Sequence, residues 1–432
     1  MAFFAYLPEI VGFLLFIMMS TQVPQIGPIL LVLEAGLVFL LLVIKRMEAL
    51  AALKRYWWLL ALPAVATFSF LWSDVPAISL RYGAQFVFTA LCGIVLAYLM
   101  TPRRFVAMLL YSTFIFCVLC VLYGRQGTSA EGMVLIGLTG SKNQIAYEAQ
   151  ILFSLAVTAL LMGQISIATR WVAILSIPFA IYLLAGTNSA TAILMAFGGS
   201  AVLVGVWMSQ SLTPGARLAT VVGGVLVVAP LLALAPEARA WVDHFMYDTL
   251  NKDPTLTGRT ILWEHADALI ARRPWLGYGY YGVWMGNSAE SIGLMHMFDV
   301  SDGRQFHFHN TFRQVSVDEG MLGFVALVGT MGAVVLGSLR RLLLTPNPAN
   351  TFFFTAFLLL VIRAFTDNII GPFSIHTMMF FAAGVYAFAP LAADVKLKVA
   401  APKPEPRGSL AVRHLQAFRD SEPMPPFSGP RQ

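Results

Sequence analysis

The feature that most constrains this chain is one long polar interruption in an otherwise apolar sequence. Residues 236–316 separate nine apolar segments from three more. This stretch holds five of the seven histidines, namely His244, His265, His296, His307 and His309. Because titratable side chains are costly inside a bilayer, a membrane protein that gathers them in one loop is expected to place its chemistry there.

The composition is that of a membrane protein. Hydrophobic residues make up 58% of the chain and charged residues 12%, with a mean hydropathy of +0.75. The apolar runs are continuous and about 20 residues long, which is the length that a helix needs to cross a bilayer. They lack the alternation of barrel strands. We therefore predict an all-α polytopic membrane protein with one large loop.

About twelve transmembrane helices are expected. Residues 1–235 would hold nine of them, 236–316 a large periplasmic loop with short helices, 317–395 three more, and 396–432 a disordered tail rich in Pro, Arg and Lys. The expected spans are 3–20, 25–44, 56–72, 83–100, 104–123, 144–163, 170–186, 189–209, 218–235, 317–339, 351–366 and 376–394.

The basic residues predict the orientation. One set of short connections carries Lys45, Arg46, Lys54, Arg55, Arg103, Arg104, Arg170, Arg217, Arg340 and Arg341. The other set holds only Arg81, Arg125, Lys142 and Arg363. Since Lys and Arg accumulate on the cytoplasmic side, both termini are expected in the cytoplasm and the large loop outside. The net charge of +6 then follows from orientation and from the tail, so no nucleic-acid partner is expected.

Several charges lie at membrane depth and need a reason. Glu34, in the middle of the second span, is expected to pair with a neighbouring helix. Arg363 and Asp367 stand four residues apart, so they share a helix face and are able to pair. Arg81, Lys142 and Arg363 are cations that the predicted topology gathers at the outer face. Such a convergence indicates a bound anion.

Within the loop, Thr257 is a candidate N-cap of a helix that Pro274 ends. Arg259 would lie in the first turn of this helix, beside free backbone N–H groups that suit phosphate oxygens. Pairing of Arg259 with Asp253 or Glu264 is the alternative interpretation.

Aromatic residues and histidines follow this helix. Trp275, Tyr278 and Tyr280 are interleaved with glycines and offer flat faces, which suit either sugar rings or packing at the membrane interface. His307 and His309 form an HxH motif, but a third metal ligand at a convincing spacing is lacking, so no metal is expected. His309 is the first candidate for a general base, and Glu319 the second.

These motifs, taken in order, resemble the O-antigen ligase/polymerase superfamily of bacterial polysaccharide assembly. The resemblance covers most of residues 25–390. It is carried by Trp72–Ser73–Asp74–Val75–Pro76 with Arg81, by Gly140–Ser141–Lys142–Asn143, by Gly258–Arg259–Thr260 with Leu262–Trp263 and Pro274–Trp275–Leu276–Gly277–Tyr278–Gly279, and by His309–Asn310–Thr311–Phe312 with Glu319–Gly320–Met321–Leu322–Gly323.

The resemblance implies a fold of the GT-C type and an enzyme of the inner membrane that needs no metal or cofactor. It implies an undecaprenyl-diphosphate-linked glycan as donor and a sugar hydroxyl as acceptor, with functional roles for Arg81, Arg259 and His309. From topology we add Lys142 and Arg363 as diphosphate-binding residues, and Asn310 joins the aromatic residues as a glycan-binding candidate.

The Ser-Lys-Asn motif is similar to the exopolysaccharide polymerase branch and favours polymerisation of a surface polysaccharide or exopolysaccharide. Ligation to lipid A core, or to a protein, is the alternative within the family. A lipid-linked glycan or anion transporter is the alternative from another class, although no internal repeat supports it. Chain-length regulators and export proteins are the protein partners expected of a polymerase.

Overall fold

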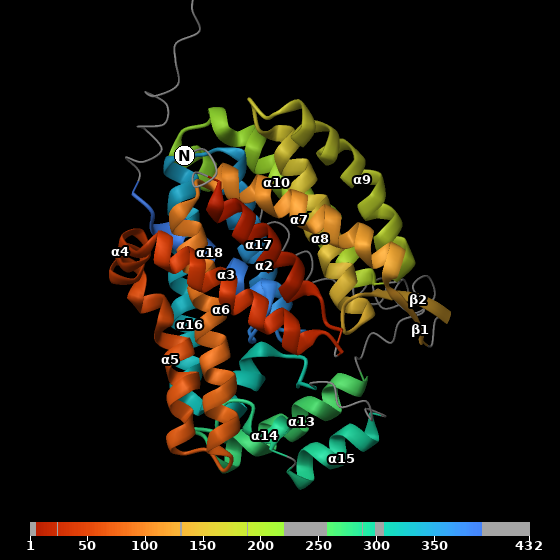
Figure 1. The fold of residues 1–432 in the computed structure, drawn as a ribbon, viewed down its shortest axis with the longest axis vertical. Coiled ribbons are helices and arrows are strands. Elements are labelled where there is room, and N and C mark those ends of the chain that lie inside the picture. Colours follow the sequence, from red (N-terminus) through yellow and green to blue (C-terminus); the bar gives the residue numbers. More distant parts are fainter. Residues whose placement is uncertain are drawn as a thin grey trace, which may run out of the picture. The chain divides into compact units, whose positions relative to one another are not determined.

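The computed structural model describes residues 6–23, 25–129, 132–187, 189–219, 257–286, 288–298 and 306–390. The chain divides into a compact unit, Met1–Phe388, and a second unit, Ala389–Gln432. The fold described here is that of the first unit (Figure 1). Most of the expected span at 218–235 and the whole tail at 396–432 lie outside the described residues.

Helices make up nearly all of the described regular structure. They are α2 Leu7–Ser20, α3 Gly27–Ile44, α4 Arg46–Tyr56, α5 Ala61–Phe68, α6 Pro76–Leu99, α7 Pro102–Tyr123, α8 Lys142–Leu161, α9 Ile167–Thr187, α10 Ala190–Met208, α13 Thr257–Arg272, α14 Gly282–Met285, α15 Ala289–Met297, α16 Thr311–Leu344, α17 Pro348–Ala364 and α18 Ile375–Phe388. Short 3₁₀ turns occur at Trp57–Leu60, Ser69–Leu71 and Ser209–Ser211.

Seven of these helices are long and apolar enough to cross a membrane. They are α3, α6, α7, α8, α9, α10 and α16, and three shorter apolar helices, α2, α17 and α18, pack among them. The all-α membrane fold is thus confirmed, with about seven candidate spans among the described residues. The total of twelve spans and the division of the chain at 235, 316 and 395 stay predictions.

The expected span 56–72 is not one continuous helix. The 3₁₀ turn Trp57–Leu60 separates α4 from α5, and Pro63 lies in the first turn of α5. Proline suits that position because its missing N–H would be unsatisfied there in any case. A β-hairpin that we did not predict, β1 Arg125–Ser129 and β2 Gly132–Gly137, connects α7 to α8.

Local sequence signals fix several helix starts. The side chains of Thr101, Ser141, Asn310 and Asn347 each accept a hydrogen bond from a backbone N–H in the first turn of α7, α8, α16 and α17. Pro102 and Pro348 follow two of these caps directly. A cap followed by proline satisfies one orphan donor and removes another, so these helices start at defined positions.

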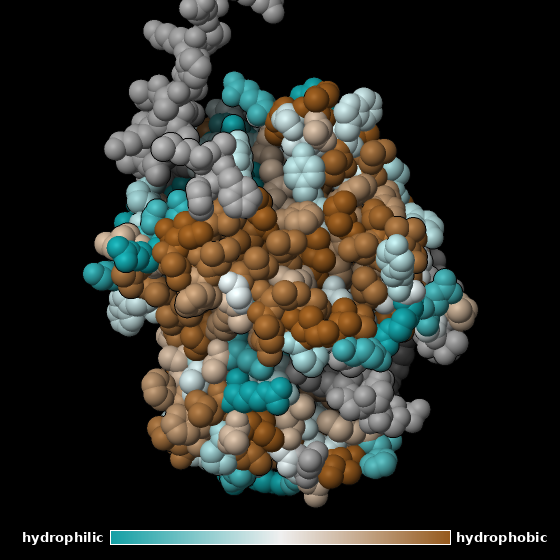
Figure 2. All heavy atoms as spheres, in the orientation of Figure 1, coloured by the Kyte–Doolittle hydropathy of each residue, from teal (hydrophilic) through white to brown (hydrophobic). Residues whose placement is uncertain are grey.

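The outside of the bundle carries the apolar surface that a membrane requires. Helix α3 illustrates this: Val32, Phe39 and Val43 are exposed, whereas Glu34 is only 3% exposed and faces the bundle. Figure 2 shows a broad apolar region on this face, with hydrophilic side chains gathered below it. The charged Glu34 therefore avoids the lipid, as its position in a span demands.

Helix α16 is interrupted at Gly320, and the loop at residues 274–282 forms hydrogen bonds with the backbone around the interruption. Gly320 has φ 64° and ψ −157°, so the helical bonds across it are lost. In their place, Tyr278 N–H donates to Val317 O at 2.9 Å and Gly279 N–H donates to Asp318 O at 2.7 Å. Met321 and Leu322 N–H in turn donate to carbonyls of residues 274 and 275. The backbone stays satisfied because the 274–282 segment, a series of turns, supplies the missing donors and acceptors.

Replacement of Gly320 by alanine is expected to destabilise the protein strongly. Its backbone conformation is accessible essentially to glycine alone, at a cost of about 1–3 kcal/mol for other residues. A Cβ would also meet the Trp275 carbonyl carbon at 2.3 Å. Gly329→Ala in the same helix is the matched control, because a Cβ there meets nothing within 4 Å. Thermal unfolding in detergent should show a large loss for Gly320→Ala and none for the control; equal melting temperatures would contradict this account.

Candidate functional site

Hydrogen bonds join the N-terminal end of α16 to the segment after α17 at one end of the bundle. The Asn310 side chain donates to Phe365 O at 3.0 Å, and Thr311 Oγ1 donates to Asp367 O at 2.8 Å. Ile369 N–H donates back to Thr311 Oγ1 at 3.0 Å. These bonds join the start of α16 to the segment after α17, and they hold Asp367 opposite the two histidines that precede α16.

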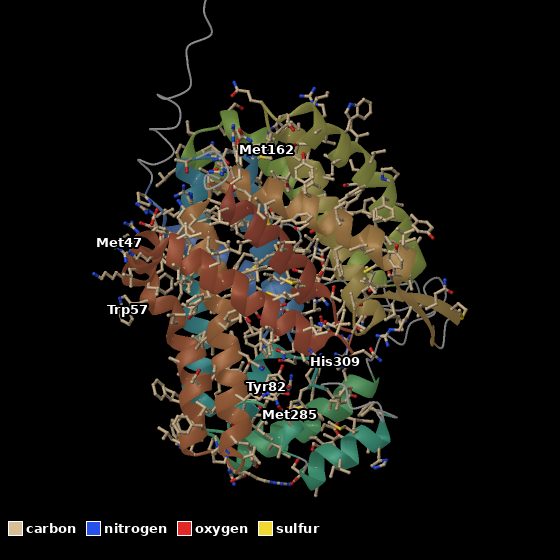
Figure 3. All side chains as sticks on the ribbon, viewed as in Figure 1. Met47, Trp57, Tyr82, Met162, Met285 and His309 are labelled. Atoms are coloured by element: carbon tan, nitrogen blue, oxygen red, sulfur yellow. The ribbon has the colours of Figure 1, made fainter. Side chains whose placement is uncertain are left out.

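Asp367 is the centre of the resulting cluster. Its Oδ2 accepts bonds from Arg363 Nη2 at 2.7 Å and Nε at 3.2 Å, which confirms the predicted pairing. Its Oδ1 lies 3.6 Å from His309 Nδ1 and 3.7 Å from His307 Nε2. One carboxylate therefore faces a guanidinium and two imidazoles. Figure 3 shows His309 where the bundle meets helices α13 to α15.

His309 is held in a strained, oriented position. Its backbone has φ 50°, a left-handed conformation that is uncommon for residues other than glycine. Its backbone N–H donates to His307 Nδ1 at 3.1 Å, so His307 carries its proton on Nε2, toward Asp367. His309 Nδ1 is buried and lacks a hydrogen-bond partner among the described residues. Strain of this kind persists where the surrounding structure over-determines the conformation, and it is frequent in active sites.

Helix α13 brings Arg259 to the cluster. Its apolar face packs Leu262, Ala266 and Leu269 into a small core with Trp284 and Phe308. Trp263 Nε1 donates to Phe308 O at 3.0 Å, and Arg313 forms a bidentate pair with Asp267, with N–O distances of 2.8 and 3.0 Å. These contacts anchor the first turn of α13 beside the histidines.

Arg259 interacts electrostatically with Asp367 and Arg363. Burial lowers the pKa of Arg259, with Asp367 opposing and Arg363 adding to that shift. Arg259 makes no salt bridge or hydrogen bond within the described part of the chain, and it is not paired with Glu264. The alternative partner Asp253 lies outside the described residues. A half-buried guanidinium that makes no ion pair with the described residues is a suitable donor for a bound anion.

The balance of charge distinguishes an anion site from a metal site. His307, His309 and Asp367 offer ligand atoms within 4.8 Å of one another, and the sequence did not identify Asp367 as the third member. However, Arg259 and Arg363 stand beside the same carboxylate, so two guanidinium groups outweigh one negative charge. A divalent cation would add to this excess, whereas an anion would neutralise it. The cluster is therefore better suited to a phosphate group.

The same electrostatics predict how stability depends on pH. Burial, and then His309, lower the pKa of His307 from 6.5 to about 3, against the pull of Asp367. Burial works to raise the pKa of Asp367, but Arg363 and the two histidines hold it well below its ordinary value. His307 thus stays neutral in the folded protein while the unfolded chain takes up a proton below about pH 6.5. The contribution of Asp367 is lost only at lower pH.

Between pH 6.5 and 4 we expect His307 to make folding less favourable by up to about 1.4 kcal/mol for each unit that the pH falls. His307→Asn removes this term, so its melting temperature in detergent should fall less steeply with pH than that of the wild type. Parallel curves for the two proteins across that range would show that His307 titrates normally in the folded state.

The structure separates Glu319 from this cluster. Glu319 is fully buried inside α16, and both of its carboxyl oxygens lack a hydrogen-bond partner among the described residues. It lies eight residues along α16 from Thr311, which is about 12 Å at the rise of a helix. His309 and Glu319 therefore do not converge on one reacting atom.

The other candidate residues surround the cluster at the same end of the bundle. Arg81 is exposed on the first turns of α6, 5.6 Å from the Tyr82 ring, and Lys142 begins α8. Trp275 is 72% exposed, and the Tyr278 ring lies 4.5 Å from the Arg273 guanidinium. Substrate binding by these four residues stays a prediction.

Two glycan-binding candidates are already engaged in the fold. Tyr280 is buried and stacks on Phe86, with ring centroids 5.5 Å apart. Asn310 is 4% exposed, and its side chain caps α16 as well as bonding to Phe365 O. Both side chains therefore hold the scaffold of the site, whatever else they contact.

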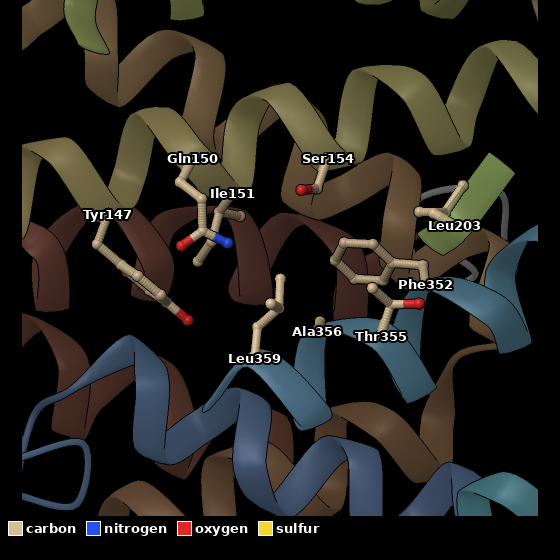
Figure 4. A pocket seen from close by; sticks show the side chains of 9 residues that line it. All are labelled: Tyr147, Gln150, Ile151, Ser154, Leu203, Phe352, Thr355, Ala356 and Leu359. Atoms are coloured by element: carbon tan, nitrogen blue, oxygen red, sulfur yellow. The ribbon is translucent and has the colours of Figure 1, made fainter. Parts of the chain in front are cut away.

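A polar hollow continues from the cluster into the bundle. The Arg363 guanidinium lies 4.3 Å from the ring centre of Tyr147, on α8. Figure 4 shows Tyr147 at one end of a hollow between α8, α10 and α17, with the Gln150, Ser154 and Thr355 side chains beyond it. Gln150 Oε1, Ser154 Oγ and Thr355 Oγ1 lack partners among the described residues. Such groups suit ordered water better than an acyl chain.

The fold and the site define a multi-pass membrane protein with a partly buried cluster of arginines and histidines around one carboxylate. Residues 171–328 match the family described as O-antigen ligase, a match that includes Arg259 and both histidines. The chain is also 27% identical over 382 residues to the exopolysaccharide production protein ExoQ of Rhizobium meliloti (strain 1021), covering 83% of each chain.

Both matches confirm the resemblance predicted from the sequence: residues 171–328 are similar to the O-antigen ligase family, and most of the chain is distantly similar to ExoQ. The long apolar helices are those of a multi-pass membrane protein. Arg81, Lys142, Arg363 and Asp367 lie outside the matched segment, so the comparison leaves their roles to the structure.

Proposed function

We propose that this protein polymerises a surface polysaccharide or exopolysaccharide. In this proposal it transfers an undecaprenyl-diphosphate-linked glycan to an acceptor sugar hydroxyl at the periplasmic face of the inner membrane. The observation that carries the proposal is the cluster in which Arg259 and Arg363 face Asp367 beside an oriented histidine. ExoQ, which is similar over most of the chain, is an exopolysaccharide production protein, and this favours polymerisation over ligation.

The proposed leaving group explains the excess of positive charge. Outside the inner membrane the energy for transfer comes from the donor's own sugar–diphosphate bond. As that bond breaks, negative charge grows on the diphosphate oxygen. Arg363 is a buried cation held by its bonds to Asp367, and Arg259 is a half-buried one; in the proposal both meet this charge. Arg81 and Lys142 stand in the proposal as outer contacts of the same diphosphate.

His309 serves as the general base. With its proton on Nδ1, facing Asp367, it keeps a lone pair on Nε2. The acceptor oxygen attacks the anomeric carbon, its proton passes to His309 Nε2, and the bond to the diphosphate oxygen breaks. Attack opposite the leaving group inverts the anomeric centre. Asp367 orients the imidazole and stabilises its charged form, as a carboxylate does in other histidine-based catalysts. Glu319, the second candidate from the sequence, takes no part in this step because it lies buried two helical turns along α16 from Thr311.

The orientation is part of the proposal. The basic connections predict cytoplasmic termini, which places the starts of α8 and α16 and the end of α17 at the periplasmic side. The cluster then lies at the outer end of a bundle whose arrangement we propose to be of the GT-C type. Cysteine labelling from outside supplies a test: a cysteine at exposed Trp275 should react in intact cells, and one at Arg340 should not.

Reconstitution tests the activity. Purified protein in liposomes is supplied with an undecaprenyl-diphosphate-linked repeat unit, without ATP and with a chelator. A ladder of products on a gel is expected, and a chelator should not change it, because the cluster already holds excess positive charge. Transfer only after addition of lipid A core or a protein acceptor would instead identify a ligase. Lack of transfer to every acceptor would contradict the proposal and favour a transporter.

A further inference from the structure

A small, partly open cavity lies beside the cluster, and the proposed mechanism does not use it. Its walls include the side chains of Ser20, Gln22, Thr139, Gln144, Glu148 and His376. They come from the end of α2, the segment before α8, the first turns of α8 and the start of α18. The cavity is therefore at the same end of the bundle as Asp367.

Two buried polar atoms in this cavity have no hydrogen-bond partner among the described residues. Glu148 is 4% exposed; its Oε1 accepts a bond from Ser20 Oγ at 3.2 Å, while its Oε2 is unsatisfied among the described residues. His376 Nδ1 lies 3.3 Å from Ser374 Oγ, and its Nε2 is likewise unsatisfied. Because an unpaired buried polar atom is costly, two of them lining one cavity indicate a ligand atom that completes the set.

The Tyr147 ring lies between His376, which lines the cavity, and Arg363 of the cluster. The His376 ring centroid lies 3.9 Å from that of Tyr147, and Arg363 approaches the same ring at 4.3 Å. A group bound between Glu148 and His376 is thus separated from the Arg363–Asp367 pair only by the Tyr147 side chain. This places the cavity within reach of a sugar whose reacting atom lies at the cluster.

We propose that Glu148 and His376 bind one hydroxyl group of the sugar that occupies the active site, an inference that rests on the proposed function. A hydroxyl both donates, here to Glu148 Oε2, and accepts, here from an imidazole N–H, so it satisfies both atoms at once. A phosphate would be repelled by the carboxylate, and an apolar chain would satisfy neither atom. The small cavity admits a hydroxyl and its carbon rather than a whole ring.

The hydroxyl belongs either to the acceptor sugar or to the donor sugar next to the diphosphate. Initial rates in the reconstituted system, with each substrate varied in turn, separate the two sources. Glu148→Gln keeps the shape of the side chain and weakens the bond. It should raise the KM of one sugar substrate about tenfold or more, since a hydrogen bond to a charged group commonly contributes that much. Glu34→Gln, another buried membrane glutamate, is the control and should leave both KM values unchanged.

A deoxy-sugar series distinguishes binding from a structural role. The wild type should discriminate strongly against the one deoxy substrate that lacks the bound hydroxyl, and Glu148→Gln should lose that discrimination. His376→Gln gives the same comparison should Glu148→Gln fold poorly. A rise in the acceptor KM or in the donor KM supports the inference and names the sugar. Discrimination equal to the wild type in both variants overturns it, with the proposed transfer intact. If the wild type transfers to no acceptor, the proposed function fails and the inference fails with it.

Discussion

Replacing Arg259 by alanine is expected to abolish chain growth while the protein still reaches the membrane. Arg259 is a half-buried cation that makes no salt bridge within the described part of the chain, and its charge acts on Asp367, so the diphosphate is its proposed partner. Loss of one fixed donor to a developing charge typically costs about 3 kcal/mol of transition-state stabilisation, roughly a hundredfold in rate. The measurement is the initial rate of glycan transfer by purified protein, with membrane abundance checked by blotting.

Arg272→Ala is the matched control for this variant. Arg272 lies on the same helix, but it is 61% exposed and paired with Glu290 at the surface. Such pairs contribute little, so transfer should stay near the wild-type rate. Arg259→Lys should recover only part of the activity, because an ammonium cannot reproduce the two-pronged bonding of a guanidinium to phosphate. Polymer of normal length and amount from Arg259→Ala would exclude Arg259 from the diphosphate site.

Replacing Asp367 by asparagine is expected to damage both the chemistry and the fold. The change leaves the size of the side chain intact but removes the charge that Arg363, His307 and His309 all face. An amide no longer fixes the tautomer of His309 or stabilises its protonated form. A comparable change in other histidine-based catalysts lowers the rate by about 10⁴-fold. We therefore expect a loss of transfer of at least about a hundredfold, read in the same assay.

The stability of the Asp367→Asn variant provides an independent reading. Removing one partner from a buried ion pair commonly costs about 3 kcal/mol, because the remaining charge is left uncompensated. Asp267→Asn breaks a pair with Arg313 at an exposed position, so its melting temperature in detergent should change far less. A wild-type rate together with a lower melting temperature would assign Asp367 to the fold alone and leave His309 without its orienting group.

The sequence predicted best the features that depend on neighbouring residues. Apolar run lengths predict the helices because bilayer thickness and backbone satisfaction admit few alternatives. The four-residue spacing of Arg363 and Asp367 made their pairing possible, and they pair although α17 ends at Ala364. The break between α4 and α5 and the β-hairpin after α7 were not predicted, since each depends on packing against other helices rather than on run length.

The candidate site was predicted in part for the same reason. Arg259 and His309 stood out because motifs carry them, and the structure brings both to Asp367. The partnership of His309 with Asp367, 58 residues onward, is a long-range contact without a local pattern. Glu319 lies near His309 in sequence, yet a helix places it two turns away, so proximity along the chain misled the choice of a second base.

What the sequence by itself determined is the class of protein: an apolar, mainly helical chain with one polar loop, and an ordered set of motifs that resembles the O-antigen ligase family. Only the tertiary structure decided which charges meet. The insertion of residues 274–282 at Gly320 and the bonds between Thr311 and Asp367 join three segments distant in sequence: the 274–282 loop, α16 and the segment after α17. Hydropathy and helix caps depend on neighbouring residues, so they can be recognised in the sequence. A charge cluster depends on which folded segments come into contact, and no local sequence pattern predicts that.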